Sequence, residues 1–419
     1  MKKVRILFVI LFLCMLNGAA VCSFLSPIRD FSDMENRALF QKPKLTEKAV
    51  LSGNYQKKYE KYLSDQIFFR DTWVGIYANM QRILGKREIN GVYLGKNGYL
   101  IEKYSEDDFD SEQENANEGL LADFLNACID VYGDSHVSCL FIPSKIEILQ
   151  KKMPDFAEQY SSEDIVKEVK KRLKSDVRVS SLLETLRDHE DEYIFYRTDH
   201  HWTTLGAYYA YEAYKKMCKE KVPKLSEYTC ENVYDDFLGT TYNKAHVYTK
   251  PDEVAVFHKN DEKKKIQIDE NNGELFSDSF YFRDAAEKGF DRYQLFFSKN
   301  TGKIEVNTDE KNGKALLVVK DSFANCFVPF LADDYEKIIM IDNRYRKIGI
   351  ETVFLEYPEI TDVLVLFNTE KFRKDTHLSS LRIKTEKLKA ICSGDKVNGS
   401  DEKSEKDSDD IFGDLISLD

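Results

Sequence analysis

The chain has 419 residues, of which 42% are hydrophobic and 13% aromatic, so it can bury a substantial core and is neither globally disordered nor a multi-span membrane protein. Its formal net charge of −12 excludes a dedicated nucleic-acid binder, because binding to phosphates requires a concentrated basic surface. The eight cysteines form no CxxC pair and no metal-ligand spacing, which argues against a structural zinc site.

The N-terminus has the pattern of an export signal. Three basic residues within the first five precede an uncharged run at 6–25, close to the ~20 residues that span a bilayer. Gly18 and Ala20 form a small-x-small site suited to signal cleavage. Residues 1–25 are therefore expected to be a signal peptide or a retained membrane anchor. Either one places the rest of the chain outside the cytoplasm, secreted or anchored to the cell membrane.

Residues 26–85 are expected to form a stem and an N-terminal helical segment. The first part, 26–50, mixes prolines, charges and isolated apolar residues, which is typical of an extended connection. From 54 to 84, apolar and aromatic residues recur at helical spacing. Two short strands around a Lys-Asn-Gly turn follow at 91–104.

The chain then alternates between helices and strands, which predicts a parallel sheet flanked by helices. Helices are expected at 118–132 and 204–217 and as a pair ending near 186, and strands at 137–143, 192–197, 314–319, 337–341 and 362–367. The last three strands are continuous apolar runs, typical of strands buried on both faces. Residues from about 218 to 310 break the pattern with polar segments and short strand-like pieces. We interpret them as an insertion of mixed structure in one α/β domain of residues 86–392.

The C-terminal residues 393–419 are polar and acidic, with few side chains that could form a core. Such a segment cannot offset the entropy that ordering it would cost. It is expected to be a disordered tail without a catalytic role.

The segment Thr198-Asp199-His200-His201-Trp202 lies directly after an expected strand and before a helix. Active sites of open α/β sheets lie at this end of the strands. A carboxylate beside a histidine can fix the tautomer of the ring and stabilise the imidazolium formed during proton transfer. Neighbouring residues of an extended chain point to opposite sides, so only one of the two histidines is expected to share the side of Asp199.

A second candidate loop, Lys320-Asp321-Ser322, follows the expected strand at 314–319 and opens a helical stretch. A serine on a sharp strand-to-helix turn is exposed to substrate, which makes Ser322 a nucleophile candidate, although a helix N-cap is the alternative. The Gly-Asp-Ser sequence that ends at Ser135 precedes a strand instead, so we interpret it as a turn.

Six other side chains are weaker candidates for oxyanion stabilisation or sugar binding, namely Arg344, Asn368, His200, Trp202, Lys145 and Arg70. Arg344 and Asn368 each follow a buried apolar strand and are expected to face the same cleft as Ser322. Trp202 could stack on a sugar ring, with core packing as the alternative. Ordinary loop polarity is the alternative for the rest.

The segment with the two histidines resembles the sequence of a known protein family. The string TDHHWTTLGAYYAY resembles the hallmark of the bacterial DHHW family and is similar to a segment of the alginate O-acetyltransferases, which belong to the SGNH-hydrolase-like superfamily. Further similar strings are DQIFFRDTW, NGVYLGKNGYL, FIPSK and VVKDSFANCFVPFL, so the resemblance covers roughly residues 28–375. It implies an SGNH-hydrolase-like fold and a triad of Asp199, His201 and Ser322. Lys320 stands where those enzymes have glycine in G-D-S-F.

The resemblance further implies an exported serine acyltransferase or esterase that acts on O-acetyl groups of a cell-envelope polysaccharide, without a cofactor or a metal. By the same analogy, a membrane protein that supplies the acyl group is an expected partner. Two alternatives stay open. The chain could be a non-catalytic envelope scaffold or glycan-binding protein with the same fold. A metal-dependent phosphoesterase would need further aspartate clusters at strand ends, and none has convincing spacing.

Overall fold

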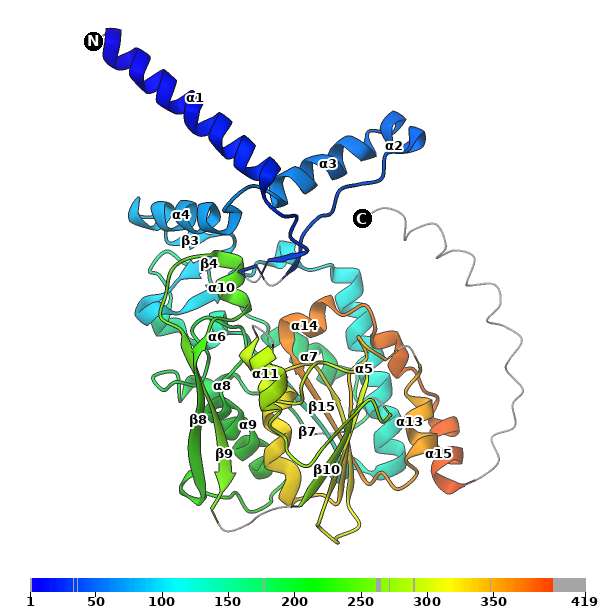
Figure 1. Cartoon of the computed structure of the whole chain (residues 1–419). Coiled ribbons are helices and arrows are strands. Elements are labelled where there is room, and N and C mark those ends of the chain that lie inside the picture. The colour runs from blue at the N-terminus through cyan, green and yellow to red at the C-terminus, as the bar shows by residue number, and fades with distance from the viewer. Residues whose placement is uncertain are drawn as a thin grey trace.

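The computed structural model describes residues 2–394, apart from 33, 36, 176–177, 261–264, 271, 289–290 and 347. Its centre is an eight-stranded sheet in the order β11-β10-β12-β14-β13-β15-β6-β7 (Figure 1). In chain order the strands are β6 (Val137–Ile142), β7 (Arg178–Ser181), β10 (Ile266–Glu270), β11 (Leu275–Ser277), β12 (Lys303–Thr308), β13 (Ala315–Lys320), β14 (Lys337–Ile341) and β15 (Asp362–Asn368). Strands β14, β13, β15, β6 and β7 run parallel to one another.

The sheet is mixed and not purely parallel, and the difference comes from the insertion. Strands β10, β11 and β12 belong to it and extend the sheet by antiparallel pairing, with β12 next to β14. In β10 and β12, buried positions alternate with more exposed ones, as expected of antiparallel strands with one covered face. Another part of the insertion, β8 (Tyr228–Phe237) and β9 (Asp252–Lys259), forms a separate antiparallel hairpin.

The expected strand at 192–197 is not part of the sheet. This segment forms a loop whose one isolated bridge joins Phe195 to Trp202. Ile194, Phe195 and Tyr196 of this loop are fully buried. A buried loop can therefore have the same run of apolar residues as a buried strand, and this led to the wrong prediction. The edge strand is β7, inside the region expected to be a helical pair, with α7 (Glu163–Lys171) before it and α8 (Leu183–Arg187) after it.

Helices cover both faces of the sheet (Figure 1). One face is covered by α5 (Ser111–Tyr132), α7, α13 (Glu351–Glu356), α14 (Thr369–Lys374) and α15 (Thr385–Ser393). The other is covered by α6 (Lys145–Ile148), α8, α9 (Thr204–Met217), α12 (Ala324–Phe327) and the β8–β9 hairpin. Alternation along β13 explains the two layers, because Leu316 and Val318 join one core cluster while Leu317 and Val319 join the other.

The N-terminal part contains α1 (Lys2–Leu25), α2 (Glu47–Leu51), α3 (Asn54–Asp65) and α4 (Arg70–Ile83). Helix α1 has a mean hydropathy of 2.4 and is long and apolar enough to cross a membrane, although a signal sequence has the same properties. Ion pairs join the stem to α3 and α4, including Arg37 with Asp65 at 2.7 Å and Arg70 with Glu35 at 2.8 Å. Arg70 is therefore a structural residue that joins α4 to the stem.

The remaining elements are the hairpin β1 (Phe31–Ser32) and β2 (Arg37–Ala38), the small sheet β3 (Glu88–Ile89), β4 (Val92–Leu94) and β5 (Leu100–Glu102), α10 (Thr240–Ala245) and α11 (Arg283–Lys288). All eight cysteines are free thiols. Most of the expected tail, from residue 395 on, lies outside the described residues.

Candidate active site

Ser322 lies in the turn between β13 and α12, in the middle of the sheet and at the carboxyl end of its parallel strands. The side chain of Asp321 fixes this turn, because it accepts hydrogen bonds from the backbone N–H of Phe323 at 2.9 Å and of Asn368 at 2.7 Å. Asn368 ends β15, so the neighbouring strand holds the turn in place. Ser322 is only 6% exposed.

The loop with the two histidines is anchored by a buried carboxylate of the insertion. Asp252 accepts hydrogen bonds from the backbone N–H of Arg197 at 2.8 Å and of Thr198 at 2.7 Å, and from the Thr198 hydroxyl at 2.6 Å. On the other side of the loop, the indole N–H of Trp202 donates to the carbonyl of Phe323 at 3.0 Å. Trp202 is completely buried and leaves no ring face for a sugar. It joins the histidine loop to the serine turn.

The two loops bring three side chains together. The Nδ1 atom of His201 lies 2.6 Å from Oδ1 of Asp199, and the Nε2 atom lies 2.7 Å from Oγ of Ser322. A carboxylate on one ring nitrogen and a hydroxyl on the other is the arrangement in which imidazole can take a proton from serine. All three side chains are buried, so water competes little for these hydrogen bonds.

Asp199 is held by donors only. Besides His201, it accepts hydrogen bonds from the backbone N–H and the hydroxyl of Thr240, both at 2.8 Å. Burial alone would raise the pKa of Asp199, but the adjacent His200 and His201 hold it well below its usual range. The carboxylate is therefore charged at neutral pH. Gly239 permits this contact, because a Cβ there would lie 2.3 Å from Cβ of Asp199.

The two histidines differ in their partners, but the expectation that they point to opposite sides was wrong. Residues 198–201 form bends and not an extended chain, so both rings lie beside Asp199 with 3.9 Å between their centroids. His200 points its Nδ1 atom to the Thr240 hydroxyl at 2.6 Å and lies 3.7 Å from the Asp199 carboxylate. Burial, together with the neighbouring His201, lowers the pKa of His200 well below its usual range. His200 is thus a neutral residue that supports the loop.

Tyr293 belongs to the insertion and was not found from the sequence. Its ring stacks on His201 with 3.8 Å between centroids and 6° between planes, and its hydroxyl donates to the carbonyl of Ser322 at 3.0 Å. It therefore fixes the imidazole and the serine turn together. Tyr293, Gly239 and Thr240 all lie in the polar segment at 218–310, where no motif marked them.

Replacing Tyr293 with phenylalanine is expected to keep the stack on His201 and to lose the hydrogen bond to Ser322. Because the carbonyl of Ser322 still accepts from the backbone N–H of Asn325 at 3.2 Å, the loss of unfolding free energy should be about 1 kcal/mol. Thermal denaturation measures this change. Tyr293→Ala also removes the stack and should cost about 3 kcal/mol or more. Equal stability of the two variants would contradict the assigned contacts.

Behind the serine turn lies a buried charged group. Nζ of Lys320, in place of the glycine of related motifs, donates to Oδ1 of Asn325 at 2.7 Å and lies 3.8 Å from Asp342. Burial lowers the pKa of Lys320. Arg344 makes two bonds to the same Asp342, at 2.9 and 2.6 Å. The guanidinium of Arg344 is therefore engaged behind the turn and does not contact Ser322.

The other weaker candidates also have structural partners. The amide of Asn368 donates to the carbonyl of Ile142 at 2.9 Å, and its oxygen caps α14. Lys145 donates to the backbone carbonyls of Leu100 and Tyr196, and burial lowers its pKa to about 8. Ser135 lies in an exposed turn before β6, at the opposite end of the sheet from Ser322, as expected.

Next to Asn368, two buried glutamates lie close together. Glu370 accepts a hydrogen bond from Ser144, and Glu147 accepts two from Ser162, at 2.6 and 2.7 Å. Burial first, and then the nearby charge of Glu147, raise the pKa of Glu370 to about 8. Glu370 is therefore protonated in the folded chain near neutral pH.

This protonation predicts a pH effect on stability. Between the unfolded pKa of about 4.3 and the folded value of about 8, the folded chain binds the extra proton, so unfolding free energy falls as pH rises. The slope is at most about 1.4 kcal/mol per pH unit. Glu370→Gln should flatten this slope and stabilise the chain at pH 8. Chemical denaturation at several pH values tests this, with the exposed Glu184→Gln as control. An unchanged slope would contradict the prediction.

Asp199, His200 and His201 also form the one group of three potential metal ligands within the described ranges, with their ligand atoms within 4.8 Å of one another. However, both ring nitrogens of His201 are already hydrogen-bonded, to Asp199 and to Ser322.

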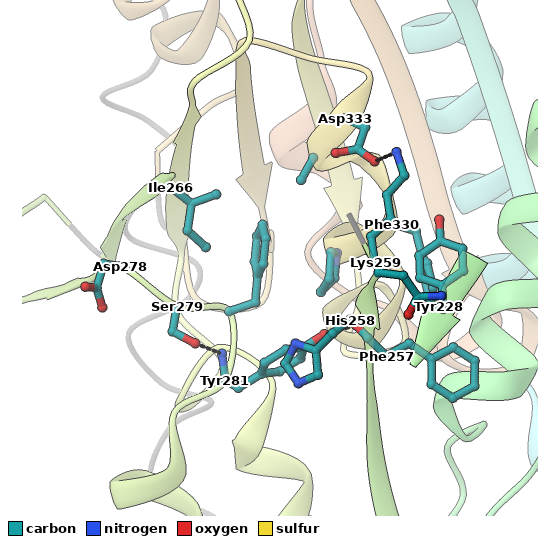
Figure 2. Close-up of a pocket in the computed structure, with 14 residues that line it drawn as sticks. Tyr228, Phe257, His258, Lys259, Ile266, Asp278, Ser279, Tyr281, Phe330 and Asp333 are labelled. Carbon is teal, nitrogen blue, oxygen red and sulfur yellow. Dashed lines mark hydrogen bonds and ion pairs between the residues drawn. The ribbon is translucent and has the colours of Figure 1, made fainter. Parts of the chain in front are cut away.

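A hollow of about 600 Å³ lies elsewhere, between β8, β9 and the turn at 328–333, and its walls contain no member of the Ser322 site (Figure 2). Aromatic rings of Tyr228, Phe257, Tyr281 and Phe330 line it. An ion pair of Lys259 with Asp333 at 2.7 Å lies at its edge, as Figure 2 shows. This hollow has the aromatic and polar walls of a small-molecule site.

Comparison with known proteins places these findings in a family context. The sequence model described as DHHW protein matches residues 94–341. The chain is similar to a probable alginate O-acetylase, AlgJ, of Pseudomonas syringae pv. tomato, with 24% identity over 228 residues that cover 53% of this chain and 54% of that protein. The chain thus spans about half the length of this curated relative.

Two solved structures have a similar fold. A DHHW family protein from Eubacterium siraeum matches with a TM-score of 0.56 and 24% identity, over 70% of this chain and 95% of that one. Bacillus cereus PatB1 with a sulfonyl adduct matches with a TM-score of 0.56 and 18% identity, over 71% of this chain and 100% of that one. At these identities the likeness concerns the fold.

Proposed function

We propose that this chain, which belongs to the DHHW family, is a serine acyltransferase or esterase that acts on O-acetyl groups of a cell-envelope polysaccharide. The observation that carries the proposal is the hydrogen-bonded series from Asp199 through His201 to Ser322, with contacts of 2.6 and 2.7 Å. We assign these residues as a triad and the sheet as an SGNH-hydrolase-like core within residues 86–392.

In the proposed reaction, Oγ of Ser322 attacks the carbonyl carbon of an acetyl ester while Nε2 of His201 takes the hydroxyl proton. Asp199 holds the ring in the required tautomer and stabilises the imidazolium. His201 then returns the proton to the leaving alcohol, and the acetyl group stays on Ser322. A sugar hydroxyl or a water molecule next gives its proton to His201 and attacks this ester. His201 returns that proton to Oγ of Ser322 as the bond to the acetyl group breaks, which restores the free serine and the neutral imidazole.

The choice of substrate rests on similarity to a protein whose name is probable alginate O-acetylase. The choice of location rests on α1, an exposed apolar helix of membrane-spanning length. We therefore propose an extracytoplasmic, membrane-tethered or secreted enzyme that takes its acyl group from a membrane protein. Purification of the chain from its native membrane without any acyl-carrying partner would contradict that last proposal.

Labelling with a fluorophosphonate tests the triad, because the reagent reacts with a serine activated by a base. We expect the wild-type chain to be labelled at Ser322, located by peptide mass spectrometry, and Ser322→Ala to be unlabelled. Circular dichroism of the variant confirms that it is folded. A wild-type chain without label would contradict the enzymatic proposal.

A glycan-binding scaffold is the second candidate, and the aromatic hollow in Figure 2 favours it. Tyr228, Phe257 and Tyr281 of this hollow are partly exposed, and accessible aromatic rings are suited to stacking on sugar rings. Glycan binding that is lost in Phe257→Ala, at a partly exposed ring of the hollow, and unchanged in Ser322→Ala, in a chain that fluorophosphonate does not label, would identify the protein as a scaffold.

A further inference from the structure

Helix α4 exposes an apolar stripe on the side that faces away from the protein body. Five of its side chains are between 46% and 82% exposed and recur at helical spacing, namely Trp73, Ile76, Tyr77, Met80 and Ile83. Leu84, directly after the helix, is 80% exposed and extends the stripe. In a surface helix of a water-soluble protein, these positions are normally polar.

The opposite side of α4 is small or polar, and this is the side that packs on the body. Ala78 is buried in a small core cluster beneath the helix. Oδ1 of Asn79 accepts from the backbone N–H of Tyr248 at 3.1 Å, and Arg82 donates to the carbonyl of Tyr248 at 2.8 Å. Asp71 pairs with Arg29 of the stem at 2.8 Å. The usual orientation of an amphipathic surface helix is reversed, and within the described part of the chain the apolar face is left uncovered, which is typical of a contact surface.

The beginning of α4 is joined to the end of α1. The hydroxyl of Ser23, near the end of α1, accepts a hydrogen bond at 2.9 Å from the backbone N–H of Phe68, just before α4. Phe69 follows in a left-handed conformation, with a φ of 55°, and is 63% exposed. Figure 1 shows α1 and α4 at the same end of the molecule. If α1 spans a bilayer, α4 begins where α1 leaves it.

The charge of this part of the chain also suits a membrane surface. Residues 26–87 contain twelve basic and seven acidic side chains, although the whole chain has a net charge of −12. Two of the basic ones, Lys86 and Arg87, follow directly after α4. Basic residues next to an anionic bilayer contribute on the order of 1 kcal/mol each. Tryptophan and tyrosine, which the stripe contains, are typical of the headgroup level.

We propose that α4 lies in the headgroup region of an anionic phospholipid bilayer, with the stripe from Trp73 to Leu84 turned into the lipid, as a second membrane contact beside α1. The inference rests on the membrane tether of the proposed function. It also orients the enzyme, because Tyr248, which α4 binds, lies three residues after α10, whose Thr240 holds Asp199. The candidate active site therefore lies at the membrane-facing end of the fold.

The test uses the full chain in vesicles of phosphatidylglycerol and brominated phosphatidylcholine, in which acyl-chain bromines quench nearby tryptophan. The chain has two tryptophans, and Trp202 is completely buried in the protein core. We expect brominated lipid to quench the part of the emission that comes from Trp73, and this loss to disappear in Trp73→Phe. Met80→Glu should weaken the quenching, whereas Leu355→Glu, at a 53% exposed leucine of α13, should not.

Emission that is equal in brominated and plain vesicles, with Trp73 open to aqueous iodide, would overturn the proposal and leave the stripe as a surface for a protein partner. Fluorophosphonate labelling in the same vesicles separates this inference from the proposed function. If fluorophosphonate labels Ser322 but brominated lipid does not quench Trp73, only the proposed contact of α4 with the bilayer is overturned. If brominated lipid quenches Trp73 but fluorophosphonate does not label Ser322, the contact of α4 with the bilayer is supported and only the proposed acyl-transfer reaction is contradicted.

Discussion

Replacing His201 with alanine is expected to lower acyl transfer per folded molecule on the order of 10⁴-fold or more, because the imidazole is the only group in contact with both Ser322 and Asp199 in the described site. The variant also leaves the buried charge of Asp199 without its partner, which should destabilise the chain by about 3 kcal/mol or more. Rates are therefore compared after correcting for the folded fraction, which is measured by circular dichroism.

A matched control is present at the opposite end of the sheet. His136 forms a pair with Asp362 at 3.0 Å, before β6, and is far from the Ser322 turn. His136→Ala also removes a histidine from a carboxylate, but it should leave the acetyl-transfer rate unchanged. A residual rate in His201→Ala within tenfold of the wild type would contradict the assignment of His201 as the base.

The second large effect is expected for Asp199→Asn. In the wild type, four donors from His201 and Thr240 meet this carboxylate, so the amide nitrogen of an asparagine must face a donor. The variant also favours the tautomer of His201 that cannot accept the serine proton. Substitutions of this kind in triads lower turnover by about 10⁴-fold. Steady-state rates with an activated acetyl ester measure the loss.

Asp252→Asn is the comparison for this variant. Asp252 is equally buried and also has four donors, from Tyr193, Arg197 and Thr198, but it contacts no ring nitrogen. Both variants should lose similar unfolding free energy in denaturant titrations, whereas the loss of turnover should be far larger for Asp199→Asn. Equal loss of turnover in the two variants would mean that Asp199 acts only as a structural anchor.

The fold was predictable where burial alone decides the structure. The apolar runs that became β13, β14 and β15 have the pattern of strands covered on both faces, and their order and type agree with the expectation. The insertion was not predictable in the same way. Strands such as β10 are short and half polar, and a sequence pattern does not reveal which strand they pair with. The edge strand β7 was missed for the same reason.

The part of the candidate site that lies at the ends of strands was predictable from the sequence. Asp199, His201 and Ser322 each follow a strand or a strand-like run, and the structure brings these three together. The groups that hold them, Tyr293 and Thr240, are far away in the sequence and carry no motif. Their role depends on how the insertion folds back over the histidine loop, which is tertiary information that residue spacing does not contain.

The position of β15 determines when the sheet can be completed during folding. It is the last strand of the sheet in the chain, yet it lies between β13 and β6, and the backbone N–H of its final residue binds the serine turn at 2.7 Å. Pairing of strands so distant in the chain is slow to form. A chain that becomes available from its N-terminus onward, as during synthesis, therefore cannot close this gap until residue 368 is free to pair. The geometry of the serine turn is therefore completed only after nearly the whole sheet sequence is free to fold.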